Sequence, residues 1–279
     1  MNTSNIPFPS AIQIRDIIER VFLNQETLNV RAYSVDWRAN AYTGKFDYPL
    51  AAGFEIIELG NSWNLWNWWS KSTPGEFELL NMRVEAVDAL HFIASDIIAC
   101  YGNDLQAMQI EAAEMLSYVQ RTLPVFQTEE EEVKYITARI KELLRYAGSM
   151  VSTRVNALQA LESLYRLAIH ACGLGLRELS TMYFAKSTLN QFRQDHGYRE
   201  KKYTKIWKHS PKLGPIEDNH VLMNWVSNES VLPKNAEVYT WLQTEYAKVL
   251  AEKAAKEEAA RKAAAINNGQ GQPSVATPN

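Results

Sequence analysis

Apolar residues recur every three to four positions along most of this chain, the spacing of helices that bury one face. The first such segment follows the capping-box sequence Ser10 to Gln13, and a longer one runs from Glu76 to about Tyr101. No alternating apolar and polar segment exceeds five residues, which argues against a sheet. The pattern therefore predicts an all-α fold, a multi-helix bundle. Further helices are predicted over residues 47–60, 128–148, 149–172 and 177–196, with others ending near 123 and beginning near 217 and 235.

The pattern of apolar and polar residues changes toward the C-terminal end, and this change divides the chain into a domain, an extension and a tail. Residues 198–216 carry no helical period and are predicted to form a loop. Residues 1–232 are expected to form one catalytic domain, and residues 233–265 a C-terminal helical extension. From 251 to 265 that helix contains only alanine and charged residues, so it has no apolar face. Residues 266–279 are low in complexity and are expected to be disordered.

Composition narrows the class of protein further. The chain has 279 residues, of which 46% are hydrophobic and 22% charged, with a net charge of -3. These are ordinary values for a globular protein, and no apolar run is long enough to span a membrane. Cys100 and Cys172 lie in apolar stretches and are expected to be reduced, buried thiols. We expect a cytoplasmic protein with no membrane association, and the near-neutral charge leads us to expect no stable nucleic-acid partner.

Two acidic pairs lie in unusual surroundings. Glu55 and Glu58 are three residues apart in a segment that is otherwise apolar, and Glu85 and Asp88 repeat this spacing in the long helix. Residues three apart share a helix face, so each pair presents two carboxylates together. Buried carboxylates are unfavourable unless paired or bound to a cation, and Mg²⁺ prefers oxygen ligands. The pairs predict a divalent metal site; the alternative is that each pair lies on a solvated helix face.

A basic and aromatic segment lies between residues 181 and 212. It holds eight basic and only two acidic side chains, a local net charge of +6. Lys186, Asn190 and Arg193 fall at positions i, i+4 and i+7, so they line one helix face. Such a segment suits a polyphosphate or single-stranded nucleic acid, and a solvated basic helix end is a third interpretation. Its combination with acidic helices favours a metal–triphosphate site.

The order of these motifs resembles that in the dimeric dUTPases. This family belongs to the all-α nucleoside triphosphate pyrophosphatases, a superfamily that also includes MazG-like enzymes and phage dCTPases. The resemblance covers roughly residues 22–222. It is carried by Glu55-x-x-Glu58, a tryptophan-rich turn, Glu85-x-x-Asp88-x-x-His91-Phe92, the block 183–194, Gly197-Tyr198, the blocks 203–207 and 217–219, and the shorter match Gln25-x-x-Leu28-Asn29.

This resemblance implies Mg²⁺-dependent hydrolysis of dUTP, and of dUDP, to dUMP, with pyrophosphate released from dUTP and a homodimeric assembly. Glu55, Glu58, Glu85 and Asp88 would hold Mg²⁺, and an activated water would attack phosphorus, with Glu55 or Glu58 accepting its proton. Gln25 and Asn29 would contact the base, Trp63 or Trp66 would form a wall of its pocket, and His91 would reach the substrate or orient a carboxylate. The residues implied to contact the phosphates or the sugar are Lys186, Asn190, Arg193, Tyr198 and Lys205.

Two other functions compete with this hypothesis. A relative of the family could act on dCTP or on a modified pyrimidine triphosphate with the same metal site. A non-catalytic helical module could bind nucleotides or single strands on the same scaffold. The intact set of four acids argues against loss of catalysis.

Overall fold

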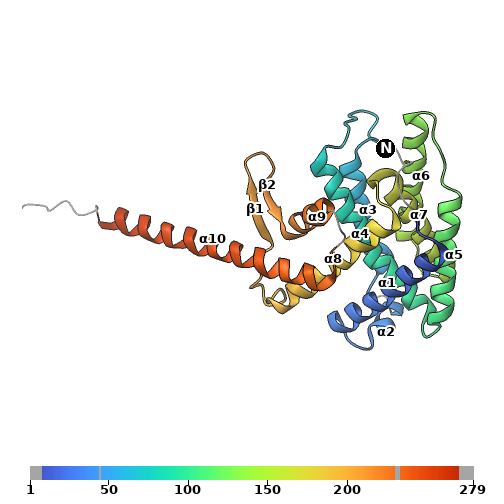
Figure 1. The fold of residues 1–279 in the computed structure, drawn as a ribbon, viewed down its shortest axis with the longest axis horizontal. Coiled ribbons are helices and arrows are strands. Elements are labelled where there is room, and N and C mark those ends of the chain that lie inside the picture. Colours follow the sequence, from blue (N-terminus) through green and yellow to red (C-terminus); the bar gives the residue numbers. More distant parts are fainter. Residues whose placement is uncertain (1–7, 44, 230–232, 270–279) are drawn as a thin grey trace, which may run out of the picture.

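The structure is a computed structural model, and it describes residues 8–43, 45–229 and 233–269. Its described part is a bundle of helices with one small sheet, which confirms the predicted all-α class (Figure 1). The elements are α1 (Ala11–Ala32), α2 (Trp37–Tyr42), α3 (Tyr48–Trp63), α4 (Glu76–Tyr101), α5 (Leu105–Arg121), α6 (Glu129–Ala147), α7 (Arg154–Cys172), α8 (Leu176–Asp195), β1 (Ile206–Ser210), β2 (Gly214–Glu217), α9 (Asp218–Asn228) and α10 (Asn235–Gly269).

Helix α4 occupies the centre of the bundle. It packs against α1, α2, α3, α5, α7, α8 and α9, and most of its side chains are buried on all sides. This matches its sequence, because apolar residues that cover most of a helix circumference require neighbours in every direction. Several polar residues of α4 are therefore buried, namely Glu85, His91, Ser95 and Asp96.

Local signals in the sequence set several helix ends. The Ser10 hydroxyl accepts from the backbone N–H of Gln13, while the Gln13 side chain accepts from the N–H of Ser10, so the capping box is confirmed. Asp47 caps α3 by accepting from the N–H of Leu50 at 2.9 Å. That cap fixes the start of the helix that carries the first acidic pair.

The structure differs from the prediction over residues 198–216. Part of this stretch forms a two-stranded antiparallel hairpin, β1 and β2, which runs on to Glu217. Gly214 has a φ of +75°, the left-handed backbone that closes such a turn and that glycine adopts without strain. The strands were missed because four or five residues are too few to show an alternating pattern. The short helix α2 was not predicted either.

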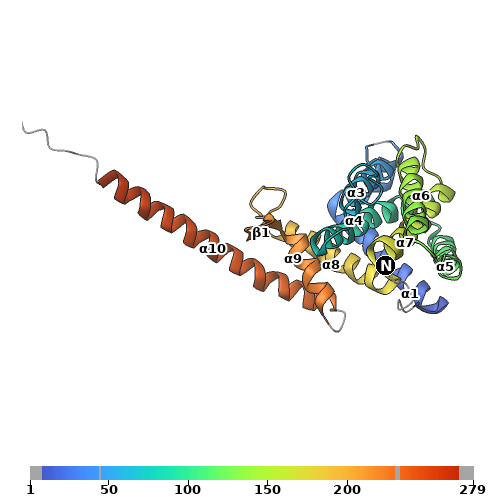
Figure 2. The same ribbon diagram turned by 90° about the horizontal axis from the view of Figure 1, so that it is seen from above.

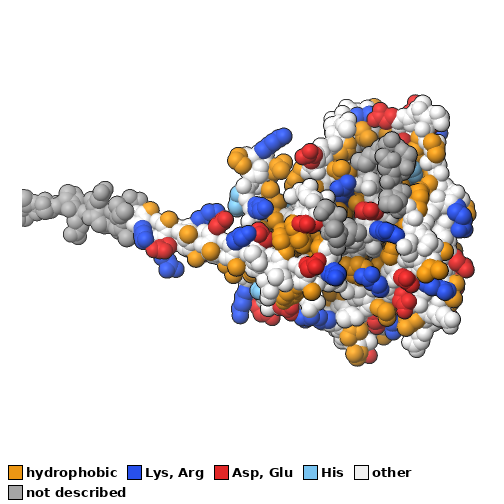
Figure 3. Space-filling model, in the orientation of Figure 1, with side chains coloured by type: hydrophobic (Ala, Val, Ile, Leu, Met, Phe, Trp, Pro, Cys, Tyr) orange, Lys and Arg blue, Asp and Glu red, His pale blue; other side chains and the backbone are white. Residues whose placement is uncertain are grey.

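Helix α10 projects far beyond the bundle, beside the hairpin (Figures 1 and 2). It runs four residues past the predicted end at 265, while residues 270–279 of the expected disordered tail lie outside the described part. Figure 3 shows hydrophobic and charged side chains mixed along the projecting part. None of the helices in the described residues is long and apolar enough to cross a lipid bilayer.

Candidate active site

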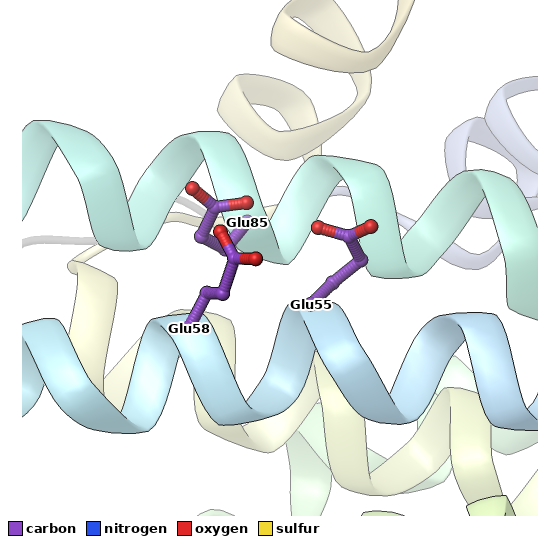
Figure 4. Close-up of side chains that lie close together, drawn as sticks. All are labelled: Glu55, Glu58 and Glu85. Carbon is purple, nitrogen blue, oxygen red and sulfur yellow. The ribbon is translucent and has the colours of Figure 1, made fainter.

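The two acidic pairs lie on adjacent helices, with Glu55 and Glu58 on α3 and Glu85 and Asp88 on α4. Figure 4 shows the carboxylates of Glu55, Glu58 and Glu85 gathered where the two helices face each other. One oxygen from each of these three side chains lies within 4.8 Å of the others. Three carboxylate oxygens at this spacing match the hard ligands that Mg²⁺ and similar divalent ions prefer.

Asp88 lies beside this group but has a different partner. Its Oδ2 accepts a hydrogen bond from Nζ of Lys186, on α8, at 2.6 Å. The lysine side chain is only 4% exposed. The positive charge of Lys186 therefore neutralises the carboxylate that the sequence assigned to the metal site.

Two carboxyls of the acidic group are harder to ionise than exposed glutamates. Burial raises the pKa of both Glu55 and Glu85, and the negative charge of Asp88 raises each further. The negative charge of Glu58 raises the pKa of both carboxyls as well. A group of acids that retains protons in this way is suited to exchange them for a divalent cation.

A cavity of about 440 Å³ opens next to the acids, between α1, α3, α4 and α8. Glu55 and Asp88 contribute to its wall. Seven of the ten residues that the sequence assigned to substrate line it as well: Gln25, Asn29, His91, Lys186, Asn190, Arg193 and Tyr198. The structure thus joins the acidic helices and the basic segment around one space.

The two amides at one end of the cavity are held in fixed orientations. Ser95 donates its hydroxyl hydrogen to the carbonyl of His91, so its Oγ accepts from Nε2 of Gln25 at 2.9 Å and from Nδ2 of Asn29 at 3.0 Å. Gln25 Nε2 also donates to Oδ1 of Asn29 at 2.9 Å. Tyr183 donates to Oε1 of Gln25 at 2.9 Å. These contacts prevent either amide from turning over without losing hydrogen bonds.

His91 belongs to the same network. Its Nδ1 lies 2.7 Å from Oε1 of Gln25, so this nitrogen carries the hydrogen. Burial lowers the pKa of His91 to about 4, which keeps the ring neutral near pH 7. Its Nε2 is buried and has no partner among the described residues, so it remains an acceptor. This histidine can therefore receive a hydrogen bond from a ligand.

Arg193 is positioned at the other end of the cavity by Asp218. Its Nε and Nη2 donate to the two oxygens of that carboxylate at 2.9 and 2.6 Å. Tyr203 donates to Asp218 Oδ2 at 2.8 Å, and the carboxylate is fully buried. Arg193 Nη1 also donates to Oδ1 of Asn190 at 3.3 Å. The remaining N–H groups of the guanidinium are available for an anion.

Three of the predicted substrate residues do not line this cavity. Trp63 is 3% exposed and packs in the hydrophobic core. Trp66 donates its indole N–H to the carbonyl of Gly60 at 2.9 Å. Lys205 pairs with Glu217 at 2.9 Å. The aromatic residues that do line the cavity are Tyr33, Tyr48, Phe92 and Tyr198, so the structure does not bring a tryptophan to its wall.

Sequence reasoning missed two of the residues that line the cavity, Ser95 and Arg31. Ser95 lies one helical turn beyond His91, so the helical period that grouped the acids could have included it. Arg31 also lines the cavity and pairs with Asp195 at the end of α8. Its partner lies more than 160 positions away, and no local pattern connects the two. An arginine at such a position carries no signal until the fold brings its partner near.

A helical bundle with two acidic pairs on adjacent helices, beside a cavity with basic side chains, is the class of all-α protein suited to hold a divalent cation and a phosphorylated ligand. Residues 17–198 match a family model described as dUTPase. This match spans well over half of the chain, which therefore belongs to the all-α dUTPase family and is an enzyme that hydrolyses dUTP. Enzymes of this family generally use a divalent metal ion. No curated protein matches the chain.

Proposed function

We propose that this enzyme is a Mg²⁺-dependent, homodimeric pyrophosphohydrolase that converts dUTP and dUDP to dUMP, releasing pyrophosphate from dUTP. The observation that carries the proposal is the acidic group of Glu55, Glu58 and Glu85 beside a cavity with fixed amides at one end and Arg193 at the other. We also propose a cytoplasmic location, on the composition of the chain and its two free thiols.

Mg²⁺ would be held by Glu55, Glu58 and Glu85, and by Asp88 once Lys186 releases it. A bound ion supplies positive charge to phosphate oxygens and lowers the pKa of water. Glu55 is the stronger candidate for the base that takes the proton of the attacking water, because it lines the cavity whereas Glu58 is exposed. Lys186 and Arg193 would stabilise the negative charge that develops on the leaving group, which is pyrophosphate for dUTP.

The fixed amides favour uracil over cytosine. Nδ2 of Asn29 has one hydrogen beyond the one given to Ser95, and its Oδ1 has a lone pair beyond the one used by Gln25. An amide that offers a donor and an acceptor complements O4 and N3–H of uracil. Cytosine presents an acceptor at N3 and a donor at its amino group, the reverse of uracil. Binding of cytosine would therefore require Asn29 and its neighbours to turn over.

The outer face of α3 supports the homodimer. Leu50, Phe54 and Ile57 lie at positions i, i+4 and i+7 and are 46%, 58% and 46% exposed. An apolar stripe of this kind on the surface is typical of a protein interface. It belongs to the helix that carries Glu55 and Glu58, so a second copy of the chain would cover the side next to the acids.

The proposal is tested with purified enzyme and dUTP, dUDP, dCTP, dTTP and UTP, each with Mg²⁺ and then with EDTA. We expect Mg²⁺-dependent formation of dUMP from dUTP and dUDP. We also expect Glu55→Gln to lower kcat by at least ~10³-fold while the circular dichroism spectrum is retained, because it removes a metal ligand and the base. Preference for dCTP would contradict the base assignment, and wild-type turnover in Glu55→Gln would contradict the site.

A further inference from the structure

Helix α10 has two parts with different surroundings. Between residues 235 and 249 it packs against α8 and β1, and Val238, Leu242 and Tyr246 are buried. From residue 250 to residue 264 every side chain is exposed. The first part therefore belongs to the packed body of the enzyme, although it was expected to be an extension outside the catalytic domain.

Tyr246 connects this helix to the loop that follows α8. Its ring stacks on that of Tyr203, with centroids 4.9 Å apart and an interplanar angle of 22°. It also stacks on Trp207 at 5.8 Å, and its hydroxyl accepts from the backbone N–H of Thr204 at 3.1 Å. The side chain is 5% exposed. Tyr246 thus fixes both the ring and the backbone position of the neighbouring loop.

A series of hydrogen bonds connects Tyr203 with Arg193, which lines the cavity. Tyr203, held by Tyr246, donates to Asp218, and the same carboxylate binds Arg193 through two hydrogen bonds. Each of these side chains is less than 10% exposed. A buried chain of this kind has few alternative arrangements, so a change at Tyr246 reaches the guanidinium in the cavity.

A second contact from α10 reaches the opposite wall. Tyr239 donates to Oδ2 of Asp195 at 2.8 Å, and Oδ1 of the same carboxylate pairs with Arg31 of α1. Arg31, on α1, is also one of the residues that line the cavity. Residues 235–249 therefore contact groups that hold both α1 and α8, and they lie outside the matched residues 17–198.

We propose that residues 235–249 of α10 brace the nucleotide cavity, with Tyr246 as a positioning residue for Arg193 and Tyr239 as a positioning residue for Arg31. This proposal rests on the proposed function in one respect, that the cavity binds a nucleotide. Residues beyond 250 take no part in it. The C-terminal addition is in this way a component of the phosphate-binding side of the site.

The first test uses no nucleotide, so its result is independent of the proposed function. Hydrogen–deuterium exchange is compared in full-length wild type, Tyr246→Leu, and a chain that ends after residue 250. We expect faster exchange over residues 193–204 in Tyr246→Leu and no change in the shortened chain. Unchanged exchange in Tyr246→Leu, or equally fast exchange in the shortened chain, would overturn the brace.

The second test measures the binding of a non-hydrolysable dUTP analogue by calorimetry. We expect Tyr246→Leu to weaken binding about tenfold and Tyr246→Phe, which keeps the stacked ring, to restore most of it. In an Arg193→Ala background the same Tyr246→Leu change should have no further effect, because its action passes through the arginine. Additive losses would refute the positioning role.

Tyr203→Phe covers the case in which Tyr246→Leu fails to fold, since it removes only the hydroxyl that contacts Asp218. It should weaken binding in wild type and not in the Arg193→Ala background; an effect of equal size in both would contradict the proposal. A wild-type enzyme that neither binds nor hydrolyses any nucleotide would refute the proposed function, while the exchange experiment would still decide the brace.

Discussion

Lys186 and Asp88 neutralise one another between α8 and α4, with nitrogen and oxygen 2.6 Å apart. Both residues are expected to change partners during catalysis, the carboxylate toward a metal ion and the ammonium toward phosphate. The lysine thus supplies a positive charge to Asp88 in a partly buried position. Burial, and then the negative charge of Asp88, raise the pKa values of Glu55 and Glu85, and the charge of Lys186 offsets part of the rise for Glu55.

This ion pair predicts that Lys186 competes with the metal. Lys186→Met should tighten Mg²⁺ binding to the nucleotide-free enzyme about fivefold, equivalent to ~1 kcal/mol, the upper range for a partly exposed ion pair. The same variant should hydrolyse dUTP more slowly, because the phosphates lose a cation. Calorimetric titration with Mg²⁺ measures the first effect. Lys186→Arg keeps the charge and should bind Mg²⁺ as wild type does; weaker Mg²⁺ binding by Lys186→Met would contradict the competition.

At the scale of elements, the acids are placed by the close approach of α3 to its neighbours. A Cβ added at Gly53 would lie 2.4 Å from the Cβ of Ala147 on α6, closer than two carbon atoms can pack. Gly53 therefore lets α3 approach α6. Glu55 is two residues further along the helix, so the position of α3 between α6 and α4 fixes where the carboxylate lies.

We expect Gly53→Ala to destabilise the enzyme by ~1–3 kcal/mol, because overpacking outweighs the better helix propensity of alanine. Gly60 on the same helix is a matched control. A Cβ there would lie 3.9 Å from Cδ1 of Ile140, an ordinary contact, so Gly60→Ala should be neutral or stabilising by up to ~0.5 kcal/mol. Urea denaturation measures both. Equal changes in the free energy of unfolding for the two substitutions would contradict the close packing of α3 on α6 at Gly53.

At the scale of the whole molecule, a neutral histidine holds α6 and α7 together. The ring of His170 meets the rings of Phe126 and Tyr135 edge-on, with centroids 5.1 and 5.2 Å apart. Neither ring nitrogen has a partner among the described residues. Burial, together with the smaller effect of the positive charge of Arg166, lowers the pKa of His170 to about 4.

The lowered pKa predicts a loss of stability in acid. The unfolded chain binds a proton near pH 6.5 and the folded chain only near pH 4, so the contribution of His170 is complete above pH 6.5 and declines below it. Between pH 7 and pH 4, wild type should lose ~2 kcal/mol more of its free energy of unfolding than His170→Leu, which cannot be protonated. Urea denaturation at several pH values checks this; parallel curves for the two proteins would contradict it.

The sequence by itself determined most helices, because their signals are local. Capping residues, glycines and apolar periods act within a few positions, so the ends of α4 and α6 could be placed closely from the sequence. The spacing of Glu55 with Glu58, and of Glu85 with Asp88, required each pair to share a helix face. The family motifs then connected these pairs with Lys186 and Arg193.

Only the tertiary structure decided which of these groups meet and what holds them. The ion pair of Lys186 with Asp88, the contacts of Arg193 with Asp218 and the brace from Tyr246 join residues far apart in the chain. A tryptophan-rich turn has the same composition whether it packs in the core or forms a pocket wall, so its place could not be predicted. Periodicity specifies the face on which a side chain lies, whereas its partner depends on how whole helices pack.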